Sequence, residues 1–274
     1  MAKTDKKLLF LCEDLHRTLI TIVHEREIKD IHCYNRWKEF ASLGLSCMVL
    51  GRLKTIIILC RSHYYQEAQV LMRSMFEIIV RALDMLTDPT DKSAKEYFAS
   101  EVYNQNYILE KMSEDIKQHK EYKPYRGYKS GDLRRWQDKL LSEKKELQKV
   151  FSDINFDKPQ KDIKALSIQL DNRKIIKTQE KYPFLMWYNL IYRPVSSIVH
   201  GKVAFDFDCY YKKSNNGQSA ILNCVNKTDP QQEEAIILTA DKLVITLFDI
   251  IFKEFNIKSP DDWKKYYNEI MQRK

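Results

Sequence analysis

Apolar residues recur three or four positions apart along most of this chain, which is the spacing that places side chains on one face of a helix. Such a series opens the chain, with Leu8, Leu11, Leu15, Leu19, Ile22 and Val23. The same period, interrupted by proline and polar turn residues, predicts a succession of helices. Their expected ranges are 8–29, 35–61, 64–86, 91–119, 132–151, 161–174, 183–200, 229–255 and a short helix from 261. The pattern therefore predicts an all-α protein.

Two places depart from the helical period. Pro194 falls inside the helix that starts at Pro183, and because proline removes a backbone donor we expect a kink or a new helix start there. After Gly201, apolar and acidic residues alternate, a Ser-Asn-Asn-Gly turn sequence follows at 214–217, and apolar residues then return. This alternation predicts a small β-hairpin inserted near 204–226.

Composition agrees with the helical class. Six glycines and seven prolines among 274 residues are few for the turn-rich all-β classes. The six cysteines form no Cys-x-x-Cys pair, and we read them as reduced thiols of a cytoplasmic protein. The polar N-terminus resembles neither a signal nor a transit peptide, and we find no uncharged apolar run long enough to predict a membrane span.

Positive charge is concentrated in the middle of the chain. Residues 111–181 contain 19 Lys and Arg against 12 Asp and Glu, which accounts for +7 of the formal net charge of +8. A phosphate-rich partner would favour such a segment, although a pair of solvated helices of mixed charge explains it equally simply. We expect a basic helical insertion at about 121–181, with tyrosines and Trp136 interleaved for stacking on single-stranded RNA. Its candidate RNA-binding residues are Arg134, Arg135, Lys144 and Lys145.

The apolar helix expected at 64–86 carries one polar stripe. Its members follow in steps of seven, four, four and three residues: Gln66, Arg73, Glu77, Arg81 and Asp84. A helix that is apolar around most of its circumference is usually central, so Arg73 and Glu77 are candidates for a functional cleft. The alternative is an ordinary intrahelical ion pair, worth about 0.2–0.5 kcal/mol when exposed.

A second group of polar residues lies in the helix that starts at Pro183. Arg193, Ser196 and His200 follow in steps of three and four residues and so share one helical face. A permanently charged guanidinium beside an imidazole that titrates near neutral pH suits phosphodiester cleavage. The alternative is that His200 only caps the helix end before Gly201. Because the chain has no His-Glu-x-x-His motif, no paired Asp-x-Asp and no phosphate-binding glycine loop, we expect neither a metal nor a cofactor.

The spacing of Arg193 and His200 resembles that of a known family motif. Arg193, six residues and His200 resemble the R-x(4–6)-H motif of the HEPN superfamily of helical-bundle proteins, many of which are metal-independent endoribonucleases. In many of those nucleases a polar residue follows the arginine, whereas Pro194 follows it here, so Arg73 is a second candidate for the guanidinium. A wider pattern is similar to a largely uncharacterised bacterial family of unknown function: Glu67-Ala68, Leu71-x-Arg73-x-x-x-Glu77 and Tyr192-x-x-x-Ser196-x-x-x-His200-Gly201.

The resemblance implies an elongated HEPN-type helical bundle, with residues 1–274 as a single helical domain and a core at 36–110 and 183–255. It also implies cleavage of RNA by attack of a 2′-hydroxyl on the adjacent phosphate. The roles it implies are proton transfer by His200, charge stabilisation by Arg193 or Arg73, orientation of an arginine by Glu77, and support from Tyr192 and Ser196.

HEPN nucleases typically pair two motifs across a dimer, so the resemblance implies a homodimer. It further implies a role as a toxin or in phage defence, with a protein such as an antitoxin as a further partner. We expect no membrane partner. The alternative function is a non-catalytic helical module that binds a protein partner or a small ligand in the same cleft.

Overall fold

The computed structural model describes residues 6–25, 37–118, 130–176, 181–193, 195, 211–213, 220–222 and 230–272. The chain forms two compact units. The first comprises Met1–Cys33, Glu39–Thr87 and Ile163–Lys274, and the second comprises Tyr34–Lys38 and Asp88–Asp162. The second unit overlaps the basic insertion expected at 121–181 but begins and ends earlier, and the core segment expected at 36–110 is divided between the two units.

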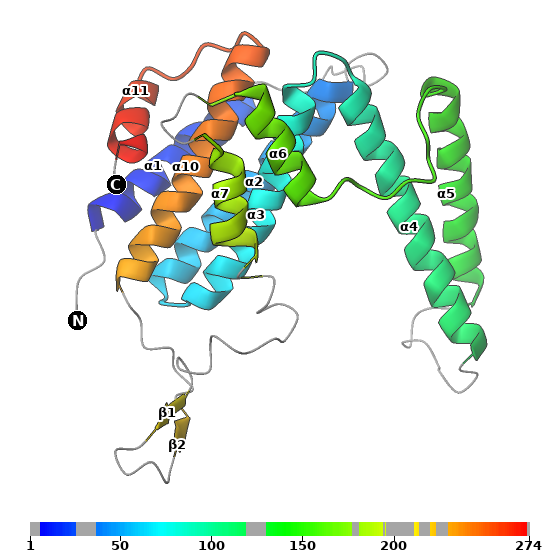
Figure 1. The fold of residues 1–274 in the computed structure, drawn as a ribbon, viewed down its shortest axis with the longest axis horizontal. Helices are drawn as coiled ribbons and strands as arrows, with labels where there is room; N and C mark the ends of the chain where they lie inside the picture. The colour runs from blue at the N-terminus through cyan, green and yellow to red at the C-terminus, as the bar shows by residue number, and fades with distance from the viewer. Residues whose placement is uncertain are drawn as a thin grey trace. The chain divides into compact units, whose positions relative to one another are not determined.

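The first unit is built around helix α3 (Figure 1). Helix α3 (Tyr65–Leu86) contacts α10 (Pro230–Glu254), α6 (Ile163–Arg173) and the π-helical turn η3 (Tyr188–Tyr192). Thirteen of its residues are buried, among them Phe76 and Leu83. This burial confirms the central position predicted for the helix, because an apolar surface on several sides needs a neighbour on each of them.

The other elements of the first unit pack against the neighbours of α3 or against one another. Helix α1 packs against α10, and two short elements at the C-terminus pack against each other. The bounds are α1 (Lys6–Glu25), α2 (Trp37–Arg61, of which Trp37 and Lys38 belong to the second unit), α7 (Pro183–Trp187), α11 (Trp263–Tyr266) and η4 (Tyr267–Met271).

The second unit contains α4 (Lys92–Gln118) and α5 (Ser130–Val150), which lie side by side (Figure 1). An aromatic cluster closes one end of this pair. The Trp37 ring lies 4.7 Å from Phe151 and 5.3 Å from Phe98, in edge-to-face geometry. Trp37 therefore contributes a hydrophobic anchor to the second unit from a distant part of the sequence.

The all-α prediction is confirmed for the part of the chain that the structure describes. The exception there is a short pair of strands, which lies in the range where a hairpin was expected. Strands β1 (Tyr211–Lys213) and β2 (Ala220–Leu222) pair antiparallel, with Tyr211 opposite Leu222. Both fall within 204–226, where the alternating pattern predicts a hairpin, and the turn between them lies outside the described residues.

The helix that starts at Pro183 changes its winding before Pro194. Five residues form the π-helical turn η3, and the Arg193 N–H donates to the carbonyl of Tyr188, five residues earlier. The chain is helical through Arg193, while Pro194 itself lies outside the described residues. The helix therefore departs from α-helical geometry about one turn before Pro194, the residue at which we expected a kink.

Helix α2 is the one helix, among those described, that is long and apolar enough to cross a membrane by length and composition. Core helices of bundles meet the same criteria. Ten α2 residues are buried, Leu50 and Leu53 fully. One side of α2 thus belongs to the helical core of the first unit.

Candidate functional site

Arg73 and Tyr192 bring together the two segments that the sequence singles out. Arg73 Nη2 donates a hydrogen bond of 3.2 Å to the Tyr192 hydroxyl. The guanidinium carbon also lies 4.4 Å from the centroid of the Tyr192 ring, within cation–π range. Tyr192 in turn stacks on Tyr188, with ring centroids 5.2 Å apart. The arginine is thus held against an aromatic pair from the π-helical turn.

A carboxylate from α6 positions the helix that carries Tyr192. Asp171 is buried, and its two oxygens accept the backbone N–H groups of Phe184 at 2.9 Å and Leu185 at 3.0 Å. These are two of the amides that a helix start leaves without intrahelical acceptors. Asp171 therefore caps α7 from another helix and fixes the start of the segment that continues into η3.

The Arg73 guanidinium keeps hydrogen-bonding capacity. Among the described residues, no carboxylate lies within ion-pair distance of it, and its buried Nε has no acceptor. The side chain is partly buried, so its charge is only partly screened by water. A half-buried cation of this kind is suited to bind an anion such as a phosphate oxygen.

Three other members of the polar stripe on α3, Glu77, Arg81 and Asp84, are engaged in structural pairs. Glu77 accepts from Arg81 at 3.1 Å, so the arginine that Glu77 orients is Arg81. Asp84 forms an ion pair of 2.9 Å with Arg173 of α6, and Arg173 also donates to the Asp84 carbonyl and to the Thr87 hydroxyl. Among these pairs, only that of Asp84 reaches another helix. Arg73 differs from the other paired members in having an aromatic partner in place of an oppositely charged one.

The predicted residues C-terminal to Tyr192 are placed only in part. The Arg193 side chain is exposed. Because successive helical residues point about 100° apart, Arg193 does not share the direction of Tyr192 toward Arg73. Ser196 and His200 lie outside the described residues.

The candidate RNA-binding residues of α5 differ in their surroundings. Arg134, Arg135 and Lys145 are exposed. Lys144 is partly buried and forms an ion pair of 2.8 Å with Asp157. Lys144 thus has a partner within the second unit, whereas the other three side chains extend into solvent.

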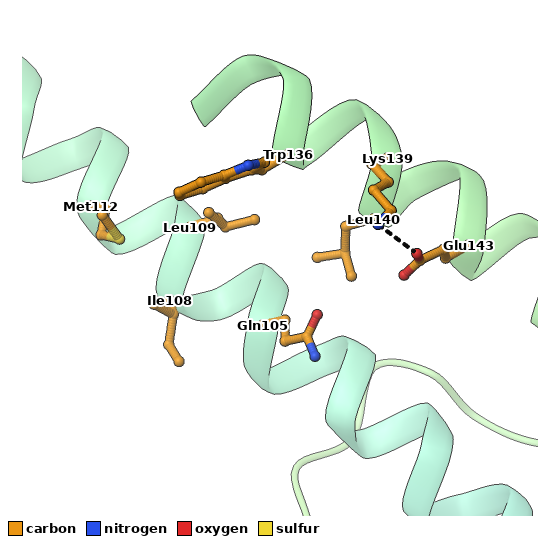
Figure 2. Close-up of a pocket in the computed structure, with 8 residues that line it drawn as sticks. All are labelled: Gln105, Ile108, Leu109, Met112, Trp136, Lys139, Leu140 and Glu143. Atoms are coloured by element: carbon orange, nitrogen blue, oxygen red, sulfur yellow. Dashed lines mark ion pairs between the residues drawn. The ribbon is translucent and has the colours of Figure 1, made fainter. Parts of the chain in front are cut away.

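Trp136 of the same helix lines a groove between α4 and α5 (Figure 2). The groove has a volume of about 350 Å³ and apolar walls that include Leu109 and Leu140, and Lys139 and Glu143 form an ion pair of 3.8 Å at one edge. Arg134 lies two residues before Trp136, so these side chains point about 200° apart on the helix. The exposed cation and the indole of the groove therefore belong to opposite faces of α5.

Another polar cluster, of which the sequence suggested only His63 as an additional candidate, links the α2–α3 turn to α10. Glu233 is buried, accepts from the Tyr65 hydroxyl at 3.4 Å, and lies 3.8 Å from Nδ1 of His63. His63 has a left-handed backbone, with φ of 62°. Along α3, eight residues separate Tyr65 from Arg73, about 12 Å, so this cluster is distinct from the Arg73 site. The sequence places Glu233 at a helix start but gives no sign that it is buried.

The residues described contain no group of three or more His, Cys, Asp or Glu side chains arranged to hold a metal ion. The groups that meet at the Arg73 site, a guanidinium and two phenol rings, are those that bind anions and aromatic rings. The chemistry of the Arg73 site is therefore that of charge stabilisation and stacking.

Comparison with known proteins places the chain among sequences without an assigned activity. A family model described as a family of unknown function (DUF5677) matches residues 39–218, which is more than half of the chain. No curated protein and no solved structure matches the chain significantly. The matched range includes both Arg73 and Tyr192 and extends past His200.

Proposed function

Because the chain belongs to the DUF5677 family of unknown function, its activity has to be argued from its own residues, and we propose that it is a metal-independent endoribonuclease of HEPN type. The observation that carries the proposal is the Arg73 guanidinium, which is partly buried, faces Tyr192 and has no acidic partner among the described residues. An arginine in these surroundings can accept the negative charge of a phosphate.

The proposed reaction is a transesterification within the RNA. The 2′-oxygen forms a bond to phosphorus, the bond from phosphorus to the 5′-oxygen breaks, and the products are a 2′,3′-cyclic phosphate and a 5′-hydroxyl. One proton leaves the 2′-hydroxyl and one reaches the 5′-oxygen, and His200 is the candidate for these transfers. Arg73 stabilises the charge that builds on the non-bridging oxygens.

Spacing supports His200 as the partner of Arg73. Tyr192, Ser196 and His200 follow in steps of four residues, so a helix that continued past Val195 would carry all three on one side. Tyr192 faces Arg73. Such a helix would place His200 about 80° from Tyr192 and about 20° from Arg193, at the edge of the side that faces Arg73.

A cleavage assay tests the proposal. Purified protein is incubated with total RNA in EDTA, and the 3′-ends of the products are analysed for cyclic phosphate. We expect cleavage by the wild type, and a loss of about 10²-fold or more for Arg73→Ala and His200→Ala, because removing one group that stabilises transition-state charge has costs of this size.

Arg193→Ala is the matched control, because it removes the same charge one residue from Tyr192, and we expect it to keep most of the activity. Circular dichroism of each variant checks that the fold is intact. RNA that stays intact at micromolar protein, or cleavage that is unchanged in His200→Ala, contradicts the nuclease. RNA binding that depends on Arg73 without cleavage supports the non-catalytic module instead.

RNA affinity gives a second prediction, because Lys144 and Lys145 differ in their partners. We expect Lys145→Ala to weaken RNA binding and to lower the slope of log K against log salt by about 0.7, the value for one phosphate contact on a single strand. We expect Lys144→Ala to change the affinity less, since Lys144 is already paired with Asp157. Fluorescence anisotropy at several salt concentrations measures both, and equal effects of the two variants contradict the prediction.

A further inference from the structure

Helix α2 has an exposed apolar face on the side away from the core. The exposed fractions of Phe40, Met48 and Ile58 are 42%, 47% and 51%. The buried residues of α2, among them Val49 and Leu53, lie on its other side. Isolated apolar residues on a surface are ordinary, but a face of this length along one helix is typical of a surface that binds another molecule.

Small residues occupy the middle of this face. Phe40, Gly44, Cys47, Gly51 and Ile58 follow in steps of four, three, four and seven residues, so they lie within about 60° of one another around the helix. A Cβ atom built on Gly44 or Gly51 meets nothing within 4 Å. The backbone of α2 is thus accessible at its centre, and a second helix can approach closely there.

We propose that this face of α2 packs antiparallel against α2 of a second copy of the chain. A two-fold axis near Val49 pairs positions that are equally distant from it. Phe40 then lies opposite the partner's Ile58, nine residues from Val49 on either side. Cys47 lies opposite the partner's Gly51, two residues from Val49. The large side chains meet near the ends of the contact and the small ones meet at its centre.

Charge complementarity supports a second copy of the chain as the partner and an antiparallel orientation of the two α2 helices. Glu39 lies at one end of the same edge of the face and Arg61 at the other, so the antiparallel arrangement brings each near the other in the partner. Arg61 is 53% exposed and pairs with Glu13, and a guanidinium has donors for a second carboxylate. A parallel arrangement would place Lys54 against Lys54 and Arg61 against Arg61. The inference concerns association alone and does not rest on the nuclease activity.

Crosslinking tests the contact at its centre. In Gly51→Cys each copy presents two thiols, and the antiparallel register places Cys47 of one copy beside the new thiol of the other. We expect copper–phenanthroline oxidation to give a disulfide-linked dimer at least 10-fold faster than in the wild type. The double variant Cys47→Ser/Gly51→Cys is the control and should lose this gain. A crosslink that persists in the double variant, or no gain in Gly51→Cys, overturns the register.

Association of the unmodified chain tests the interface itself. We expect sedimentation equilibrium to give a dimer at micromolar concentration, and Gly51→Arg to weaken it at least 10-fold, since the open space above Gly51 lets the monomer fold. Ser142→Arg adds the same charge at an exposed site of α5 and should leave the dimer intact. A monomer at 100 micromolar, a dimer insensitive to Gly51→Arg, or flotation with phosphatidylcholine/phosphatidylserine vesicles that Gly51→Arg abolishes, overturns the proposal.

Discussion

Arg173→Ala should lower the free energy of unfolding by about 3–5 kcal/mol, because it leaves a buried carboxylate without its cation. Asp84 is 5% exposed and lies 2.9 Å from Arg173. The same guanidinium donates to the Asp84 carbonyl and to the Thr87 hydroxyl at the end of α3. Urea denaturation followed by circular dichroism measures the change.

Lys253→Ala provides the control for this loss, because Lys253 also pairs with an acid in the first unit but is 70% exposed. We expect it to cost at most about 0.5 kcal/mol. The double change Asp84→Leu/Arg173→Met should recover part of the loss, since it removes the unpaired charge along with its partner. Equal effects of Arg173→Ala and Lys253→Ala would contradict the structural role of the buried pair.

Asp241→Asn should stabilise the protein above neutral pH. Asp241 is fully buried and accepts a hydrogen bond of 2.7 Å from the Cys12 thiol, while its other oxygen has no partner in the described structure. Burial raises the pKa of Asp241 to about 7, and the hydrogen bond from Cys12 opposes this shift only in part. Since the ordinary value is 3.8, folding favours the protonated carboxyl, whose contribution is complete below about pH 4 and is lost as the pH rises to 7.

The loss amounts to about 4 kcal/mol, at 1.36 kcal/mol for each unit of pKa difference. Asparagine cannot ionise, so the advantage of Asp241→Asn should be largest at pH 8 and should shrink as the pH falls toward 4. Urea midpoints of both proteins between pH 5 and 9 test this, and the histidines cancel in the comparison. If the two pH profiles run parallel, the carboxyl does not titrate in this range and the prediction is wrong.

The periodicity of apolar residues predicted most of the fold. The helix expected at 64–86 is α3 (Tyr65–Leu86), and two members of its polar stripe, Arg73 and Asp84, contact neighbouring elements. What spacing could not show is the partner of each polar group, since Arg173 and Tyr192 lie about a hundred residues away along the chain. Pairs so distant in sequence leave no periodic signal, and they depend on how the helices pack.

The contact within the candidate site could not be predicted from the sequence. Arg73 and Tyr192 were both candidates, and their contact distinguishes Arg73 from Arg193 in a way that a motif spacing could not. Glu77 was expected to orient an arginine, and the one it binds lies four residues along its own helix. Residues four apart lie on one face of a helix, so an intrahelical ion pair of Glu77 could be predicted from the sequence as an alternative.

In the basic segment, helical spacing shows which side chains share a face, and the number of charges does not. Arg134 and Lys145 are eleven residues apart and share a face of α5, while Trp136 lies on the opposite one. Helical spacing alone therefore separates the cation from the aromatic groove. The pairing of Lys144 with Asp157, in contrast, depends on the loop after α5 and could not be predicted from periodicity.

The last turn of α6 binds both of the segments that carry the Arg73 site. Asp171 holds the first amides of α7, and Arg173, two residues later, holds the end of α3. Two residues turn a helix by about 200°, so these side chains reach in opposite directions from one rigid turn. The contact between Arg73 and Tyr192 thus depends on a short piece of helix that holds both of the segments carrying them.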